Sequence, residues 1–186
     1  MNQTNPIAPA GNPAPAAPPA SMGWQSILFI VAGLVITIDH LTKLLVEAWL
    51  PLNTTWAPFP ALGDYFRLTH TSNTGAAFGL FPGGSPVFAA VAVGVALFIL
   101  VYNYRLEAGH TLLRVALGLQ LGGAMGNLID RLRLGHVTDF FDFGPWPVFN
   151  VADLAVVTGV VLLGFLMFRE QREEQKERNE RPGAPN

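Results

Sequence analysis

The chain of 186 residues contains no cysteine and few charged residues. The missing cysteines exclude disulfides, thiolate metal sites and cysteine nucleophiles. Charged residues make up 13% of the sequence, against about 25% in typical soluble domains. The four histidines are scattered without metal-motif spacing, so we expect no metal and no other cofactor. A net charge of −2 without a basic cluster gives no sign of a nucleic-acid partner.

Hydrophobic residues, by contrast, make up 51% of the chain and gather in four long runs, at about 24–46, 86–104, 111–130 and 150–168. Each run approaches or exceeds the roughly 20 residues that cross a bilayer as a helix. Residues 1–22 form an uncharged Ala/Pro-rich tail, which we expect to be disordered. Because the tail lacks Lys and Arg and the first run is long, we interpret that run as an uncleaved span.

Basic residues predict how these spans are oriented, because they favour the cytoplasmic side. Seven basic residues lie on the side of the termini and three on the opposite side. This distribution places both termini in the cytoplasm and the connections 49–85 and 131–149 outside. Residues 169–186 then form a charged cytoplasmic tail. The seven are Arg105, Arg114, Arg169, Arg172, Lys176, Arg178 and Arg181, and the three are Arg67, Arg131 and Arg133.

The two outer connections contain short segments with the composition of strands. Residues 64–70 and 136–143 are rich in aromatic and β-branched residues, and both are followed by glycine-containing breaks. We therefore expect an all-α membrane fold of four helices with a small β-layer on the outer face. Aromatic residues of this layer should lie near the lipid headgroups.

Four aspartates cluster where the last two spans meet the outer connection: Asp130, Asp139, Asp142 and Asp153. A carboxylate in or beside a membrane helix is costly unless paired, so it is a functional candidate. Two such carboxylates that share a proton could perform aspartic proteolysis. In an extended segment Asp139 and Asp142 point to opposite faces. We expect one of them to face solvent, and spacing does not indicate which.

Structural explanations compete for the same residues. Asn150 and Asp153 have the spacing of a helix N-cap and its first turn, which would satisfy free backbone N–H groups. Asp130 could form an interfacial ion pair with Arg131, although an arginine at headgroup level also suits a lipid phosphate or a peptide carbonyl.

Two further patterns indicate helix packing. Asp39 and Lys43 are four residues apart in the first span, which predicts a self-compensating ion pair with a structural role. In the third span small residues at every fourth position predict a face that another helix approaches closely. The small residues of this stripe are Gly118, Gly122 and Gly126, and Arg114 and Asp130 continue it at the same spacing.

Five sequence blocks in order closely resemble the bacterial lipoprotein signal peptidases (signal peptidase II), over about residues 24–168. The blocks are Asp39-x-x-x-Lys43, Asn73-Thr-Gly-Ala-Ala-Phe78, Gly126-Asn-Leu-Ile-Asp-Arg131, Val137-Thr-Asp-Phe140 and Phe149-Asn-Val-Ala-Asp153. The connection between the last two blocks is short for the family.

The resemblance implies an intramembrane aspartic peptidase of the bacterial inner membrane, formed by residues 23–168, with its active site toward the periplasm. Its substrate would be a prolipoprotein, cut before a cysteine that carries diacylglycerol. Membrane lipid would be its other partner, and we expect a monomer. The resemblance implies catalytic roles for Asp139 and Asp153. It also implies substrate-binding roles for Asn73, Asn127, Arg131 and Asn150. Asp39, Lys43 and Asp130 occupy motif positions as well, and we expect them to be structural.

Two other functions remain open on the residues alone. Intramembrane acids also serve as proton relays, so a small proton-coupled transporter is possible. The acids lie at span ends and no inverted repeat is visible, which argues against this function. A non-catalytic lipid-binding or assembly protein would use the glycine-lined face instead.

Overall fold

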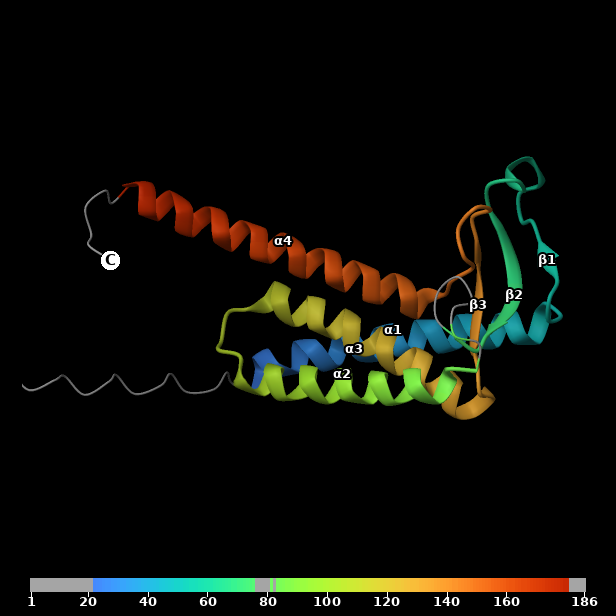
Figure 1. Ribbon diagram of the computed structural model, residues 1–186, viewed down its shortest axis with the longest axis horizontal. Coiled ribbons are helices and arrows are strands. Elements are labelled where there is room, and N and C mark those ends of the chain that lie inside the picture. Colours follow the sequence, from blue (N-terminus) through green and yellow to red (C-terminus); the bar gives the residue numbers. More distant parts are fainter. Residues whose placement is uncertain (1–21, 76–80, 82, 181–186) are drawn as a thin grey trace, which may run out of the picture.

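Four helices form the body of the protein in the computed structural model, which describes residues 22–75, 81 and 83–180 (Figure 1). They are α1 (Met22–Trp49), α2 (Ser85–Arg105), α3 (Thr111–Leu134) and α4 (Val151–Glu180). All four are long and apolar enough to cross a membrane. The residues outside this description are 1–21 of the predicted disordered tail, 76–80, 82 and 181–186; residues 76–78 are the last three of the Asn73–Phe78 block.

Helix α3 lies at the centre of the bundle and packs against the three other helices. Its glycine stripe faces α1 closely: a Cβ atom added to Gly118 would lie 2.8 Å from Val31 Cβ, and one added to Gly122 would lie 2.6 Å from Val35 Cβ. Both distances are shorter than real Cβ contacts. The stripe is therefore a packing surface, as the spacing predicted.

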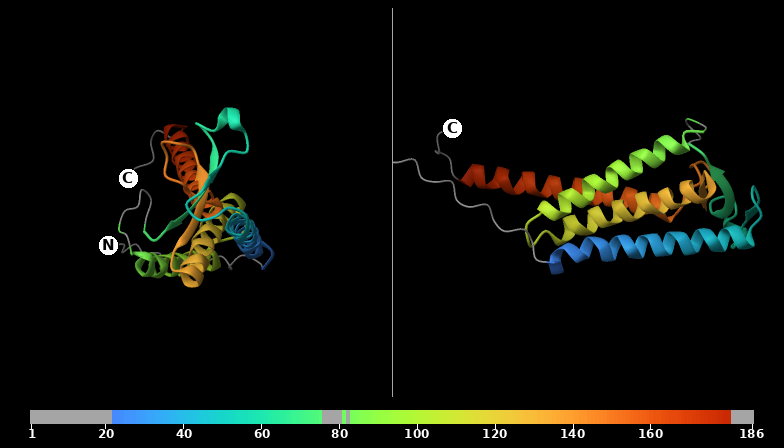
Figure 2. Two further views of the ribbon diagram at one scale, coloured as in Figure 1. Left: turned by 90° about the vertical axis from the view of Figure 1, so that its right-hand side faces the viewer. Right: turned by 90° about the horizontal axis from the view of Figure 1, so that it is seen from below.

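A three-stranded antiparallel sheet covers one end of the bundle, in the order β1 (Thr55–Trp56), β2 (Arg67–Asn73) and β3 (Val137–Asp142). A short 3₁₀ helix, Pro60–Leu62, lies between β1 and β2. The sheet lies at the end opposite the C-terminal end of α4, and Figure 2 shows it across the bundle end. Four apolar helices with a small β-layer confirm the predicted fold class.

An irregularity in β2 determines which side chains face each side of the sheet. Leu68 pairs with Phe141 and Thr71 pairs with Asp139, so β2 has one residue more than β3 between these pairs. An extra residue reverses the alternation of side chains in the longer strand. As a result, odd-numbered residues of β2 contact Asp142 at one end and Asp139 at the other.

The connection from β3 to α4 is tied back onto the sheet. It turns at Gly144, whose φ of 74° favours glycine. Phe149 then exchanges two backbone hydrogen bonds with Phe141, of 2.8 and 3.1 Å. This bridge brings the residues that follow, Asn150 and the first turn of α4, beside Asp139.

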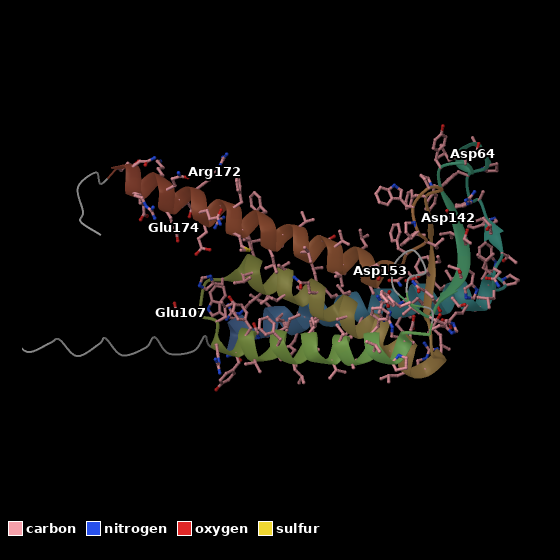
Figure 3. The ribbon with its side chains drawn as sticks, in the orientation of Figure 1. Asp64, Glu107, Asp142, Asp153, Arg172 and Glu174 are labelled. Atoms are coloured by element: carbon pink, nitrogen blue, oxygen red, sulfur yellow. The ribbon has the colours of Figure 1, made fainter. Side chains whose placement is uncertain are left out.

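Charged side chains lie at the two ends of the bundle. Figure 3 labels Asp142 and Asp153 near the sheet, and Glu107 and Glu174 toward the opposite end. Arg114 lies at that opposite end but is fully buried. It donates hydrogen bonds to the Leu106 and Glu107 carbonyls, of 2.7 and 3.0 Å, and so binds the carbonyl groups that follow the end of α2.

Candidate active site

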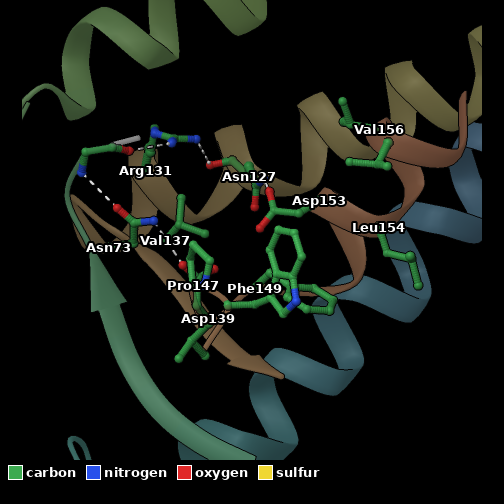
Figure 4. Close-up of a pocket in the computed structure, with 14 residues that line it drawn as sticks. Asn73, Asn127, Arg131, Val137, Asp139, Pro147, Phe149, Asp153, Leu154 and Val156 are labelled. Atoms are coloured by element: carbon green, nitrogen blue, oxygen red, sulfur yellow. Dashed lines mark hydrogen bonds between the residues drawn. The ribbon is translucent and has the colours of Figure 1, made fainter. Parts of the chain in front are cut away.

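A cavity of about 610 Å³ lies between β3, the end of α3 and the start of α4 (Figure 4). Five of the six predicted catalytic and substrate-binding residues line it: Asn73, Asn127, Arg131, Asp139 and Asp153. The sixth, Asn150, is fully buried and hydrogen-bonds to Asp139 and Asp153. Apolar side chains form most of the remaining wall: Val137, Trp146, Pro147, Val148, Phe149, Leu154, Val156 and Val157.

The Asp139 carboxyl is almost completely buried, at 2% exposure. Asn73 Nδ2 donates to its Oδ2 at 3.0 Å, and Asn150 Nδ2 donates to its Oδ1 at 2.6 Å. Burial, and then the negative charge of Asp153, raise the pKa of Asp139 to about 7, although the two hydrogen bonds and Lys43 act in the opposite direction. A carboxyl with this pKa can hold or release a proton near neutral pH.

Asp153 lies in the first turn of α4 and forms a capping box with Asn150. The Asp153 N–H donates to Asn150 Oδ1 at 2.9 Å, and the Asn150 N–H donates to Asp153 Oδ2 at 3.4 Å. The other carboxylate oxygen, Oδ1, accepts a 2.7 Å hydrogen bond from Asn127 Nδ2. The predicted helix cap is thus present, and the same two residues also belong to the site.

Three asparagines present their amide NH₂ groups to the two carboxyls. Asn73 and Asn150 donate to Asp139, and Asn127 donates to Asp153. In each case a donor binds the amide oxygen and so determines which way the amide points. These donors are Gly75 N–H for Asn73, Asp153 N–H for Asn150, and Lys43 Nζ with Asn150 Nδ2 for Asn127.

Asp142 lies on the opposite face of β3 from Asp139 and is not among the residues lining the cavity. The prediction that one of the two aspartates faces solvent is wrong, because Asp142 is only 5% exposed. Arg67 Nε and Thr69 Oγ1 each donate to it at 2.7 Å. Burial alone would raise the pKa of Asp142, but the hydrogen bonds from Arg67, Thr69 and Gly144 outweigh burial and hold this pKa below its usual value.

Asp130 and Arg131 have separate partners. Asp130 Oδ2 lies 2.9 Å from Lys43 Nζ, and Asp130 Oδ1 lies 3.7 Å from Arg133. Arg131 donates to the Asn127 and Gly75 carbonyls at 3.3 and 3.5 Å and lies over the Phe88 ring. The alternative of an Asp130–Arg131 ion pair is therefore not what the structure shows, because the two side chains diverge at the end of α3.

The model of the signal peptidase (SPase) II family matches residues 31–169. The chain belongs to the signal peptidase II family. Curated lipoprotein signal peptidases are similar over most of the chain. That of Moorella thermoacetica is 47% identical over 72% of this chain and 87% of its own length. That of Halothermothrix orenii is 40% identical over 78% of this chain and 98% of its own length.

A solved bacterial membrane enzyme has the same fold, with a TM-score of 0.73 and 24% identity over 90% of this chain and 98% of that one. A second solved bacterial membrane enzyme has a TM-score of 0.69 and 25% identity, over 80% of this chain and 95% of that one. These findings confirm the family and the peptidase activity that the sequence predicted.

Thr138 and Glu47, which the sequence analysis did not single out, lie next to the site residues without lining the cavity. Thr138 Oγ1 donates to Glu47 Oε1 at 2.8 Å, and the Thr138 N–H donates to Asp130 Oδ2 at 3.1 Å. Glu47 follows Lys43 by four residues, and Lys43 follows Asp39 by four. This spacing on one helix face was the signal that could have identified Glu47.

Proposed function

We propose that the chain removes signal peptides from prolipoproteins and that Asp139 and Asp153 are its catalytic pair. The observation that supports this most directly is the shared cavity, which both carboxyls line and beside which each carboxyl accepts hydrogen bonds from asparagine amides. The relatives' function as lipoprotein signal peptidases supports the substrate class.

The pair performs general acid–base catalysis with a single shared proton. The raised pKa of Asp139, about 7, favours one proton on the pair near neutral pH. The ionised member takes a proton from water as the water oxygen bonds to the scissile carbonyl carbon. The protonated member gives its proton to the carbonyl oxygen. The C–N bond then breaks as one member of the pair gives a proton to the leaving nitrogen, and a hydroxyl of the intermediate gives its proton to the other member as the carbonyl re-forms.

The apolar wall of the cavity supports a lipid-modified substrate that enters from the bilayer. Leu154 and Val157 line the cavity and are also more than half exposed on α4. An apolar path therefore leads from the hydrocarbon region to the carboxyls. It suits a signal helix and the acyl chains of a diacylglyceryl-cysteine, while Asn73 and Arg131 supply polar contacts for the peptide backbone and lipid head.

The excess of basic residues near the termini supports cytoplasmic termini in a bacterial inner membrane, with the sheet and the catalytic pair toward the periplasm. Both carboxyls and all three amide donors come from one chain. This supports a monomer as the active unit.

The test is cleavage of a synthetic lipobox peptide carrying diacylglyceryl-cysteine by the detergent-purified protein. Asp139→Asn and Asp153→Asn should each lower kcat by at least about 1,000-fold, within the range for loss of a general acid or base. Asp142→Asn is the matched control on the same strand. Appreciable turnover by either the Asp139→Asn or the Asp153→Asn protein would contradict the pair, and proton flux in proteoliposomes without cleavage would favour a transporter.

A further inference from the structure

A buried ion cluster lies directly behind the proposed catalytic pair. It consists of Asp39 and Lys43 of α1 and Asp130 of α3, all fully buried. Lys43 Nζ lies 2.8 Å from Asp39 Oδ2 and 2.9 Å from Asp130 Oδ2. The short Asp39–Lys43 distance confirms the predicted ion pair. Its position beside the site raises the question of whether it serves packing alone.

The lysine of this cluster contacts the amide that faces Asp153. Lys43 Nζ donates to Asn127 Oδ1 at 3.0 Å, and Asn127 Nδ2 donates to Asp153 Oδ1 at 2.7 Å. An ammonium group can only donate hydrogen bonds. A flipped Asn127 amide would direct its NH₂ group at the ammonium and its oxygen at the carboxylate. Lys43 therefore holds the amide in the orientation that serves Asp153.

The two carboxylates of the cluster bind the backbone next to each catalytic residue. Asp39 Oδ1 accepts a 2.9 Å hydrogen bond from the Ala152 N–H, one residue before Asp153. Asp130 Oδ2 accepts a 3.1 Å hydrogen bond from the Thr138 N–H, one residue before Asp139. The cluster thus connects α1 and α3 with the two elements that carry the pair.

We propose that the Asp39–Lys43–Asp130 cluster positions the catalytic pair, with Lys43 orienting the Asn127 amide toward Asp153 and the two carboxylates holding the backbone before each aspartate. This inference rests on the proposed function. Lys43 is a positioning residue rather than a catalytic one, because Asn127 lies between its ammonium and the Asp153 carboxylate and it is not among the residues lining the cavity.

A double-mutant cycle between Lys43→Met and Asn127→Ala tests the route through the amide, with kcat and KM measured on the lipobox peptide for monodisperse protein. Lys43→Met should lower kcat by about 100-fold, the scale of a small misplacement of a catalytic group, and leave KM within about twofold, because uniform substrate binding is retained. In the Asn127→Ala background the same change should lower kcat by less than about threefold, because coupled residues are not additive.

Removing Lys43 alone leaves Asp39 without a cation and Asp130 with only the more distant Arg133, at 3.7 Å, which can prevent folding. The same cycle is then run in an Asp39→Asn background. There Lys43→Met leaves one buried carboxylate instead of two, and the doubly substituted cluster has the same net charge as the wild-type cluster. The amide oxygen introduced by Asp39→Asn remains an acceptor for the Ala152 N–H. In this second cycle, the kcat and KM of each variant are compared with those of the Asp39→Asn protein.

An equal loss of kcat with and without the Asn127→Ala change would overturn the proposal, since a purely structural lysine acts independently of the amide. A folded Lys43→Met protein with wild-type kcat would overturn it as well. If Lys43→Met is active while Asp139→Asn and Asp153→Asn are inactive, only the positioning role is rejected. Active aspartate variants would reject the proposed function itself.

Discussion

Replacing Asp139 with asparagine should produce an inactive protein. The stability of this variant relative to wild type should increase as the pH rises. The pKa of Asp139 is raised from 3.8 to about 7 by burial and by Asp153, so ionising this carboxyl costs free energy in the folded chain only. Below pH 3.8 both the folded and the unfolded chain hold the proton, and the folded protein carries no penalty. The penalty grows between the two pKa values and is complete above about pH 7.

The size of the effect follows from the width of this interval. At 1.36 kcal/mol per pKa unit, the penalty is about 2 kcal/mol at pH 5 and about 4 kcal/mol at pH 8. Asp139 is only 2% exposed, so solvent screening does not reduce these values much. Asparagine avoids the penalty but loses one hydrogen bond, because its NH₂ group must face Asn73 or Asn150. That loss is the same at both pH values, so their difference isolates ionisation.

The measurement is thermal unfolding in detergent at pH 5 and pH 8, followed by the fluorescence of the four tryptophans. The Tm of Asp139→Asn relative to wild type should be higher at pH 8 than at pH 5 by about 5 to 10 °C, from about 2–4 °C per kcal/mol for a chain of this size. Asp142→Asn is the control of opposite sign: its pKa is held below the usual value, so this variant should lose stability relative to wild type as pH rises through the acidic range. An Asp139→Asn shift that is equal at both pH values would contradict a raised pKa for Asp139.

Two further predictions concern packing and the second aspartate of β3. Gly122→Ala should lower the free energy of unfolding by about 1–3 kcal/mol through overpacking, because the added Cβ would lie 2.6 Å from Val35 Cβ. Gly94→Ala is the control in the same unfolding assay, because a Cβ added there has nothing within 4 Å. Asp142→Asn should retain most peptidase activity, because Asp142 binds Arg67 on the face of β3 away from Asp139; a loss of cleavage as large as that of Asp139→Asn would contradict the assignment.

The spans and the packing of α3 were predictable because they depend on local composition and spacing. A run of about 20 apolar residues has few alternatives to a membrane helix. Glycines at every fourth position must share one helix face, and Gly118 and Gly122 contact α1 as that rule requires. The Asp39–Lys43 pair follows the same rule. In each case the residues that form the pattern belong to one helix, so their spacing predicts that they share a face.

The choice between Asp139 and Asp142 was not predictable from spacing, because it depends on contacts between distant segments. The extra residue in β2 determines which of its side chains reach each face of β3. The Phe141–Phe149 bridge then brings Asn150 to the face of Asp139. Neither feature has a local sequence signal, and the resemblance to signal peptidase II indicated Asp139 through its motif instead. Glu47 on α1 shares the four-residue spacing of Asp39 and Lys43, but its partner Thr138 lies on β3, and no local pattern predicts that contact.

The contrast between these two aspartates shows how the site keeps a proton available. Both carboxyls are buried on one short strand, and both accept several hydrogen bonds. Asp142 faces a guanidinium group, and its pKa is held low. Asp139 faces the neutral amides of Asn73 and Asn150, and its pKa stays raised to about 7. Amides orient a carboxyl without supplying the full charge that would remove its proton. Lys43 Nζ donates to Asn127, which in turn donates to Asp153. In the mechanism proposed above, this arrangement orients the pair and leaves its proton exchangeable.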